Sequence, residues 1–150
     1  MRRIVIVGIC VLLAGCVTVQ IPNYIPADHP YVRKVSGNYN EIIDAIKVVL
    51  FKDGYSIKSQ VNPAIYERRS DGGDQSKDVL FFTNMKQHPK FLYSTYTHFN
   101  IFVHPIAEGA EVDVRYNATT PVWLKQFQGS RNDKLANRFL NQVEQELESK

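Results

Sequence analysis

Two stretches of alternating side chains decide the fold: YSTYTHFNIFVH at residues 93–104 and AEVDVRYNA at residues 110–118. Successive side chains of a β-strand point to opposite sides of the sheet. The first stretch therefore places Phe99, Ile101 and Val103 on one face, and the second mirrors it with an apolar and a polar row. The polar rows contain Tyr96, His98, Asn100, His104, Glu111, Asp113, Arg115 and Asn117. This pattern predicts two antiparallel strands in a sheet with one covered face and one wetter face.

Further strands are expected before this pair. YSIKSQV at residues 55–61 alternates, and AIYERR at residues 64–69 is predicted to be its hairpin partner across a turn at Asn62 and Pro63. DVLFFTNMK at residues 78–86 is predicted to be a more deeply buried strand, because it is apolar without clean alternation.

Two amphipathic helices complete the predicted fold. The first is expected from an N-cap at Asn38, with Glu41 three residues later, to about Lys52, with Gly54 as the stop signal. The second covers the last twenty residues and is capped near Asn132. The sequence therefore predicts an α+β fold of two layers, in which an antiparallel meander of about five strands packs against an N-terminal and a C-terminal helix.

The chain begins with features of a secretory signal. Arg2 and Arg3 precede an apolar run over residues 4–13, which is much shorter than the ~20 residues that a membrane-spanning helix needs. A basic start, a short apolar region and small residues at the end are typical of a signal peptide.

The end of this signal, Leu13, Ala14, Gly15 and Cys16, resembles the lipobox of bacterial lipoproteins. The resemblance implies cleavage before Cys16, diacylglycerol on its thiol and an acyl chain on its new amino group; no other cofactor is expected. It implies membrane lipid as a partner through Cys16. Val17 stands where the inner-membrane retention signal of the family has Asp, so the expected location is the periplasmic face of the outer membrane.

We expect three segments: a cleaved signal peptide at residues 1–15, a lipidated tether at residues 16–35, and a single globular domain at residues 36–150. Prolines at 22, 26 and 30 argue against a helix or a central strand in the tether. An extended spacer is the first interpretation. A segment bound as a strand is the alternative, because the tether carries several apolar residues.

Composition excludes some functions. The 18 Lys and Arg residues fall to 16 when Arg2 and Arg3 leave with the signal, against 15 Asp and Glu, so no basic excess points to a nucleic acid partner. Cys10 also leaves and Cys16 carries lipid, so the mature chain has no free thiol for a disulfide or for thiol catalysis.

No catalytic or metal site is predicted. Ser94, His98 and Asp113 could be named as a hydrolytic trio, but a chain of this length contains such a set by chance. His98 and His104 share a strand face yet stand about 20 Å apart, too far to bind one ion. We therefore expect a protein that is not an enzyme.

The candidate binding residues lie in two places. TTPVWLKQFQGS at residues 119–130 is expected to be an irregular connection carrying Trp123, Leu124 and Phe127. These side chains could cap the core, anchor a partner protein, or dip into the bilayer surface. The second place is the polar sheet face around Tyr96, His98 and Arg115.

The pattern of helix, DGYSIKSQVNPAIYERR, strand meander and closing helix resembles the helix-grip domains of small envelope lipoproteins, one of which belongs to the β-barrel assembly machinery. That resemblance implies a non-enzymatic accessory or scaffold protein that binds other cell-envelope proteins. The alternatives are a carrier of a lipid or another apolar ligand and, less favoured, an envelope hydrolase.

Overall fold

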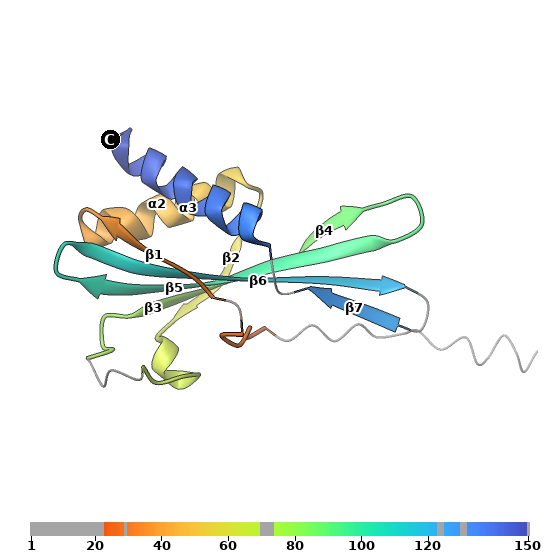
Figure 1. The fold of residues 1–150 in the computed structure, drawn as a ribbon, viewed down its shortest axis with the longest axis horizontal. Helices are drawn as coiled ribbons and strands as arrows, with labels where there is room; N and C mark the ends of the chain where they lie inside the picture. Colours follow the sequence, from red (N-terminus) through yellow and green to blue (C-terminus); the bar gives the residue numbers. More distant parts are fainter. Residues whose placement is uncertain (1–22, 29, 70–73, 123–124, 130–131, 150) are drawn as a thin grey trace, which may run out of the picture.

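The computed structural model describes residues 23–28, 30–69, 74–122, 125–129 and 132–149. Two helices lie on one face of a seven-stranded antiparallel sheet (Figure 1). The predicted α+β architecture is confirmed. The first of these helices follows a strand, however, instead of opening the domain.

The sheet has more strands than the five expected. Its strands are β1 (Tyr31–Ser36), β2 (Ile57–Val61), β3 (Val79–Thr83), β4 (Lys86–Pro89), β5 (Ser94–Ile106), β6 (Gly109–Val122) and β7 (Lys125–Gly129). The strand order is β1-β6-β5-β3-β2, while β4 also pairs with β5 and β7 also pairs with β6. The long strands β5 and β6 therefore form the middle of the sheet, with different neighbours along their two halves.

The β5–β6 hairpin has the faces that the alternation predicted. Its register pairs Phe99 with Tyr116 and Ile101 with Val114, and these side chains are buried toward the helices. Gly109 closes the hairpin turn at φ +149, a backbone conformation that side chains rarely adopt.

The helices begin and end where their capping signals indicate. Helix α2 (Tyr39–Lys52) starts after Asn38, whose side chain accepts a hydrogen bond from the Asn40 N–H. It ends with Gly54 at φ 76, and the Gly54 and Tyr55 N–H groups donate to carbonyls of the last turn, as in a Schellman motif. Helix α3 (Asp133–Glu148) starts after Asn132, which accepts from the Leu135 N–H.

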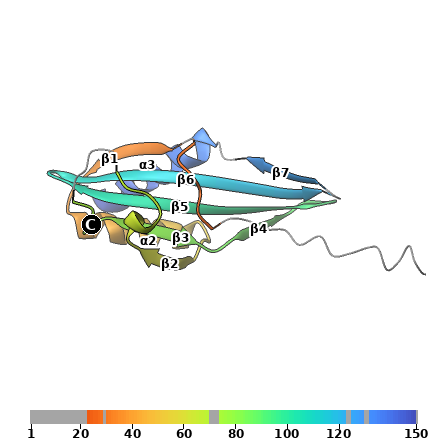
Figure 2. The same cartoon turned by 90° about the horizontal axis from the view of Figure 1, so that it is seen from below.

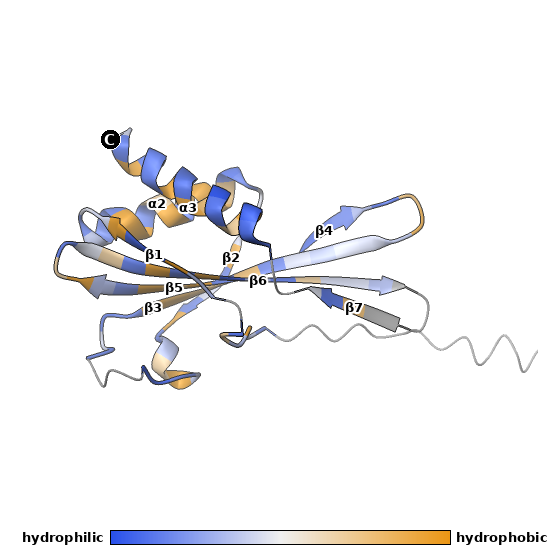
Figure 3. Cartoon of the chain, in the orientation of Figure 1, coloured by the Kyte–Doolittle hydropathy of each residue, from blue (hydrophilic) through white to orange (hydrophobic). Residues whose placement is uncertain are grey.

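Apolar side chains fill the space between the helices and the sheet, and Figure 3 shows the apolar inner sides of both helices. The largest fully buried members are Ile42, Ile46, Phe81, Phe99 and Phe139. A smaller cluster of Leu80, Phe82 and Phe102 lies on the opposite face of the sheet with Tyr24 and Val61. The face expected to be wetter is therefore partly covered as well.

Three predicted segments need correction, two of them in the sheet and the third in the tether. Residues 64–69 do not form a strand, because the Asn62 side chain accepts from the Ala64 N–H and opens the short 3-10 helix Pro63–Ile65; the true partner of β2 is β3. Residues 119–122 and 125–129 do not belong to an irregular connection, because β6 continues to Val122 and β7 pairs with it. Pro121 fits because it lies beyond the last β5–β6 pair, Tyr96 with Thr119, where no donor to β5 is needed.

The tether is shorter than the predicted residues 16–35. Tyr31–Ser36 pairs along its whole length with β6, and Ile25 is buried on the sheet. Pro26 and Pro30 lie between Ile25 and β1 and have no N–H group to donate. The neighbouring Ile25 N–H donates to Asn100 instead. The folded domain therefore begins by residue 23, and residues 16–22 lie outside the part that the structure describes.

Candidate functional site

The face of the sheet opposite the helices holds the N-terminal segment of the described chain. Residues 23–28 cross over β5 and β6 on this face (Figure 2). The Asn100 side chain accepts from the Ile25 N–H at 2.6 Å and donates to the Asn23 carbonyl at 2.9 Å. Because Asn100 is fully buried, these two bonds fix the segment to the centre of β5.

Arg115 holds the same segment from the neighbouring strand β6. Its guanidinium donates to the Ile25 carbonyl at 3.1 Å, to both carboxylate oxygens of Glu67 at 2.6 and 3.1 Å, and to Asp113 at 2.8 and 2.9 Å. It also stacks 3.8 Å from the ring centre of Phe102. We call Asn100, Arg115, Glu67 and the segment 23–25 the N-terminal clamp.

Burial and ion pairing shift the pKa values of Arg115 and of the two carboxylates that it binds. Burial alone would lower the pKa of Arg115, but its hydrogen bonds to Glu67 and the negative charge of Asp113 outweigh burial, so this pKa is raised. Hydrogen bonds from Arg115 lower the pKa of Glu67 more than burial raises it. Burial dominates at Asp113 and raises its pKa despite the adjacent guanidinium. Arg115 is thus the cation that pairs with the carboxylates of both Glu67 and Asp113.

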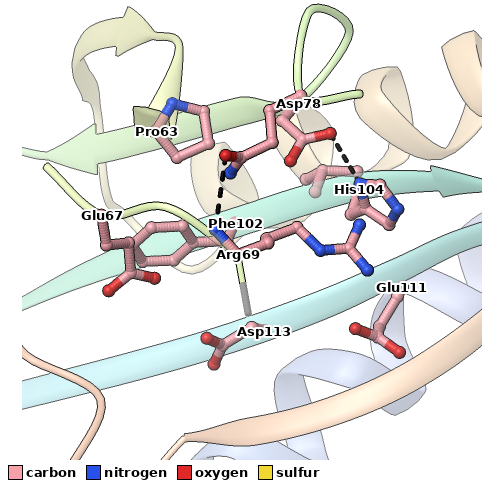
Figure 4. Close-up of a pocket in the computed structure, with 10 residues that line it drawn as sticks. Pro63, Glu67, Arg69, Asp78, Phe102, His104, Glu111 and Asp113 are labelled. Atoms are coloured by element: carbon pink, nitrogen blue, oxygen red, sulfur yellow. Dashed lines mark hydrogen bonds and ion pairs between the residues drawn. The ribbon is translucent and has the colours of Figure 1, made fainter. Parts of the chain in front are cut away.

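A small pocket lies beside the clamp, and Figure 4 shows its lining side chains. Its volume is about 100 Å³, and its walls include Arg69, Asp78, His104, Glu111 and Asp113. His104 Nδ1 lies 2.6 Å from a carboxylate oxygen of Asp78. This volume is well below the ~300 Å³ from which small-molecule sites start. The pocket has room for a few waters but does not fit a lipid chain.

The second distinctive feature is a projection of the sheet. Strands β4 and β7 flank residues 94–97 of β5 and 118–122 of β6, and this four-stranded part extends beyond the helices (Figure 1). We call it the arm. Its end is the turn between β4 and β5, where the Lys90 N–H donates to the Tyr93 carbonyl at 2.7 Å. Phe91 and Leu92, the central residues of this turn, are 99 % and 84 % exposed.

The structure separates the predicted binding residues. Phe127 lies on the edge strand β7 and is 59 % exposed, and Tyr96 is half-buried on the arm. His98 and Arg115 were expected on an exposed surface, and this is wrong: they are 3 % and 4 % exposed. Trp123 and Leu124 lie outside the described residues, as do the signal-cleavage residues Leu13, Ala14 and Gly15 and the lipidation residue Cys16.

The named hydrolytic trio is not brought together. Ser94 and His98 are four residues apart on β5, whereas Asp113 is opposite Phe102, four residues farther along the strand. Asp113 is instead bound by Arg115. Within the described ranges, no three His, Cys, Asp or Glu side chains are grouped so that they could bind a metal ion.

Sequence reasoning placed Asn100 on the polar face but missed the clamp residue Glu67 and the apolar turn at Phe91 and Leu92. Asn100 and Arg115 were placed on one face, and their direct pairing follows from the hairpin register. An apolar pair directly after Pro89 and Lys90 was a usable signal for an exposed apolar turn.

Comparison with known protein families and with curated protein sequences gave no match for this chain. Among the described helices, none is long and apolar enough to cross a membrane.

Proposed function

We propose that this protein is a lipid-anchored accessory or scaffold protein on the periplasmic face of the outer membrane, where it binds other cell-envelope proteins. The resemblance of residues 13–16 to a lipobox supports the anchor. Val17 after Cys16 supports the outer membrane. The arm supports the binding role, because it extends beyond the body of the domain and carries exposed apolar side chains.

The observation that carries the binding role is Phe127 on β7. Among the described strands β7 pairs only with β6, so its other edge offers backbone donors and acceptors to a partner strand. Strand addition at such an edge is a common way to bind a protein segment. An aromatic side chain on the same strand adds a contact of the kind that dominates binding energies.

The carrier alternative has less support. The space between the helices and the sheet is filled by the core, including Phe81, Phe99 and Phe139. The pocket beside the clamp is too small and too charged for an apolar ligand.

The test is site-specific photocrosslinking in living cells, with a photoreactive phenylalanine analogue at Phe127. The matched control places it at Val32, which is 53 % exposed on β1. We expect a defined protein adduct from position 127 that position 32 does not give, and Phe127→Ala should abolish co-purification of the same protein. A lipidated, folded protein that gives no adduct at 127 would contradict the proposed interface. Copurified lipid in place of protein would favour the carrier.

The anchor has a separate test in Cys16→Ser. This variant should lose labelling by a radioactive fatty acid and accumulate as uncleaved precursor, because acylation of the thiol precedes cleavage in lipoproteins. Normal cleavage of Cys16→Ser would refute the lipobox.

A further inference from the structure

The turn at the end of the arm has an unusual composition. Central positions of tight turns favour Gly, Asn, Asp and Pro, which suit the backbone or interact with water. Here they are Phe91 and Leu92, which are almost completely exposed and pack against nothing within the described residues. Figure 3 shows this turn as an apolar end of a polar arm. Two large apolar side chains at such a corner contribute nothing to the core.

The flanking residues are those that suit a membrane interface. Lys90 is exposed at the base of the turn and Tyr93 is 45 % exposed opposite it. Tyrosine rings favour the headgroup level of a bilayer, and a lysine there interacts with lipid phosphates. A two-residue turn is also too small for a stable protein interface, which buries ~800 Å² on each partner.

The covalent distances allow the turn and the lipid to reach one bilayer. The clamp holds Asn23 at Asn100, and the seven residues from Cys16 to Asn23 span at most ~25 Å. Leu92 is eight residues from Asn100 along β5 and the turn that precedes it, which corresponds to ~26 Å. The proposed lipid and the turn are therefore at comparable distances from the clamp.

We propose that Phe91 and Leu92 insert into the bilayer surface and provide a second membrane contact beside the lipid on Cys16. This inference rests on the proposed lipid anchor. The contact directs the arm toward the membrane, while the edge of β7 stays accessible along the side of the arm.

The experiment uses the full mature lipoprotein in vesicles of phosphatidylethanolamine and phosphatidylglycerol. The mature chain has no free thiol, so Leu92→Cys can carry an environment-sensitive fluorophore alone. The matched control is Phe51→Cys, which is 81 % exposed at the end of α2 and separated from the turn by the length of β4. We expect lipids with a nitroxide near the headgroup to quench the probe at 92 and not at 51. Adding Phe91→Ser should lower the ratio of inserted to free turn about tenfold, because one of the two buried side chains is lost.

The outcomes separate the two proposals. Acylated protein whose probe at 92 is quenched by aqueous iodide and not by nitroxide lipids would overturn insertion and leave the anchor standing. Equal quenching at 92 and 51 would also overturn it, since the contact would not be specific to the arm. If mass spectrometry shows that the mature protein carries no acyl chains, the anchor is refuted. The proposed insertion of the turn, which rests on the anchor, is then refuted as well.

Discussion

Arg115→Ala should destabilise the domain far more than the loss of a surface ion pair. Arg115 is 4 % exposed, and its guanidinium binds Asp113, Glu67 and the Ile25 carbonyl. The alanine variant leaves the buried carboxylate of Asp113 without its cation and removes the hydrogen bond to the Ile25 carbonyl. It also creates a cavity over Phe102.

The magnitude follows from burial. Breaking a buried ion pair by removing one partner costs about 3–5 kcal/mol. The Glu67 side chain is 34 % exposed, so water can solvate its carboxylate when the guanidinium is removed. We therefore expect a destabilisation at the low end of this range, about 3 kcal/mol. With a urea slope of about 1.5 kcal/mol per M, the midpoint of unfolding should fall by about 2 M.

The assay is urea unfolding of the mature lipoprotein in detergent micelles, followed by far-ultraviolet circular dichroism. Arg138→Ala is the matched control, because Arg138 also pairs with a carboxylate, Asp53 at 3.6 Å, but its side chain is 60 % exposed. It should cost no more than about 1 kcal/mol. Arg115→Met with Asp113→Leu should recover part of the loss, since the buried Asp113 carboxylate is removed together with its cation, and the Glu67 carboxylate that remains is 34 % exposed to water. A midpoint shift below about 0.5 M for Arg115→Ala, or a double variant as unstable as the single one, would refute the reasoning.

Two further predictions concern the sheet and its pH dependence. Gly109→Ala should cost about 3 kcal/mol by urea unfolding, because φ is +149 and the new Cβ would lie 2.0 Å from the Val35 carbonyl oxygen, whereas Gly129→Ala, in open space, should change stability by less than about 0.5 kcal/mol. Equal effects of the two variants would contradict this reading. Arg115 lowers the pKa of Glu67 below 4.5, so the stabilisation by Glu67 is complete above pH 4.5 and is lost as the pH falls through the folded-state pKa. Glu67→Gln should therefore lose less stability than the parent protein between pH 5 and pH 3, and a parallel loss would show that Glu67 does not contribute.

Local signals in the sequence were sufficient for the two helices, the β5–β6 hairpin and the main core. Gly54 marks the end of α2 because only a positive φ allows the two capping hydrogen bonds that close the helix. The alternation over residues 93–104 placed Phe99 and Ile101 under the helices. Both signals depend on residues that are close in the sequence, so they can be recognised without knowledge of the tertiary structure.

The clamp was not predictable in the same way. Arg115 was assigned to an exposed surface because a charged residue on a polar strand face is usually solvated. Its burial depends on Glu67 and Ile25, which are 48 and 90 positions away in the sequence. The segment before β1 was assigned to the tether for a related reason: its hydrogen-bond partners are the side chains of Asn100 and Arg115, and no local pattern encodes them.

The clamp connects the proposed anchor to the proposed binding surface. Because Asn100 holds Asn23 on the middle of β5, a lipid on Cys16 would tie the bilayer to the centre of the sheet and not to a loose end. The chain between them reaches ~25 Å at most, so under the proposed anchor the domain would bind only proteins close to the membrane. A partner that adds a strand beside Phe127 must therefore present it close to the bilayer surface, as a membrane protein or another lipoprotein does. Asn100→Ala together with Arg115→Ala should release the segment and lengthen this reach by the residues up to β1, and crosslinks from Phe127 should then extend to proteins farther from the membrane.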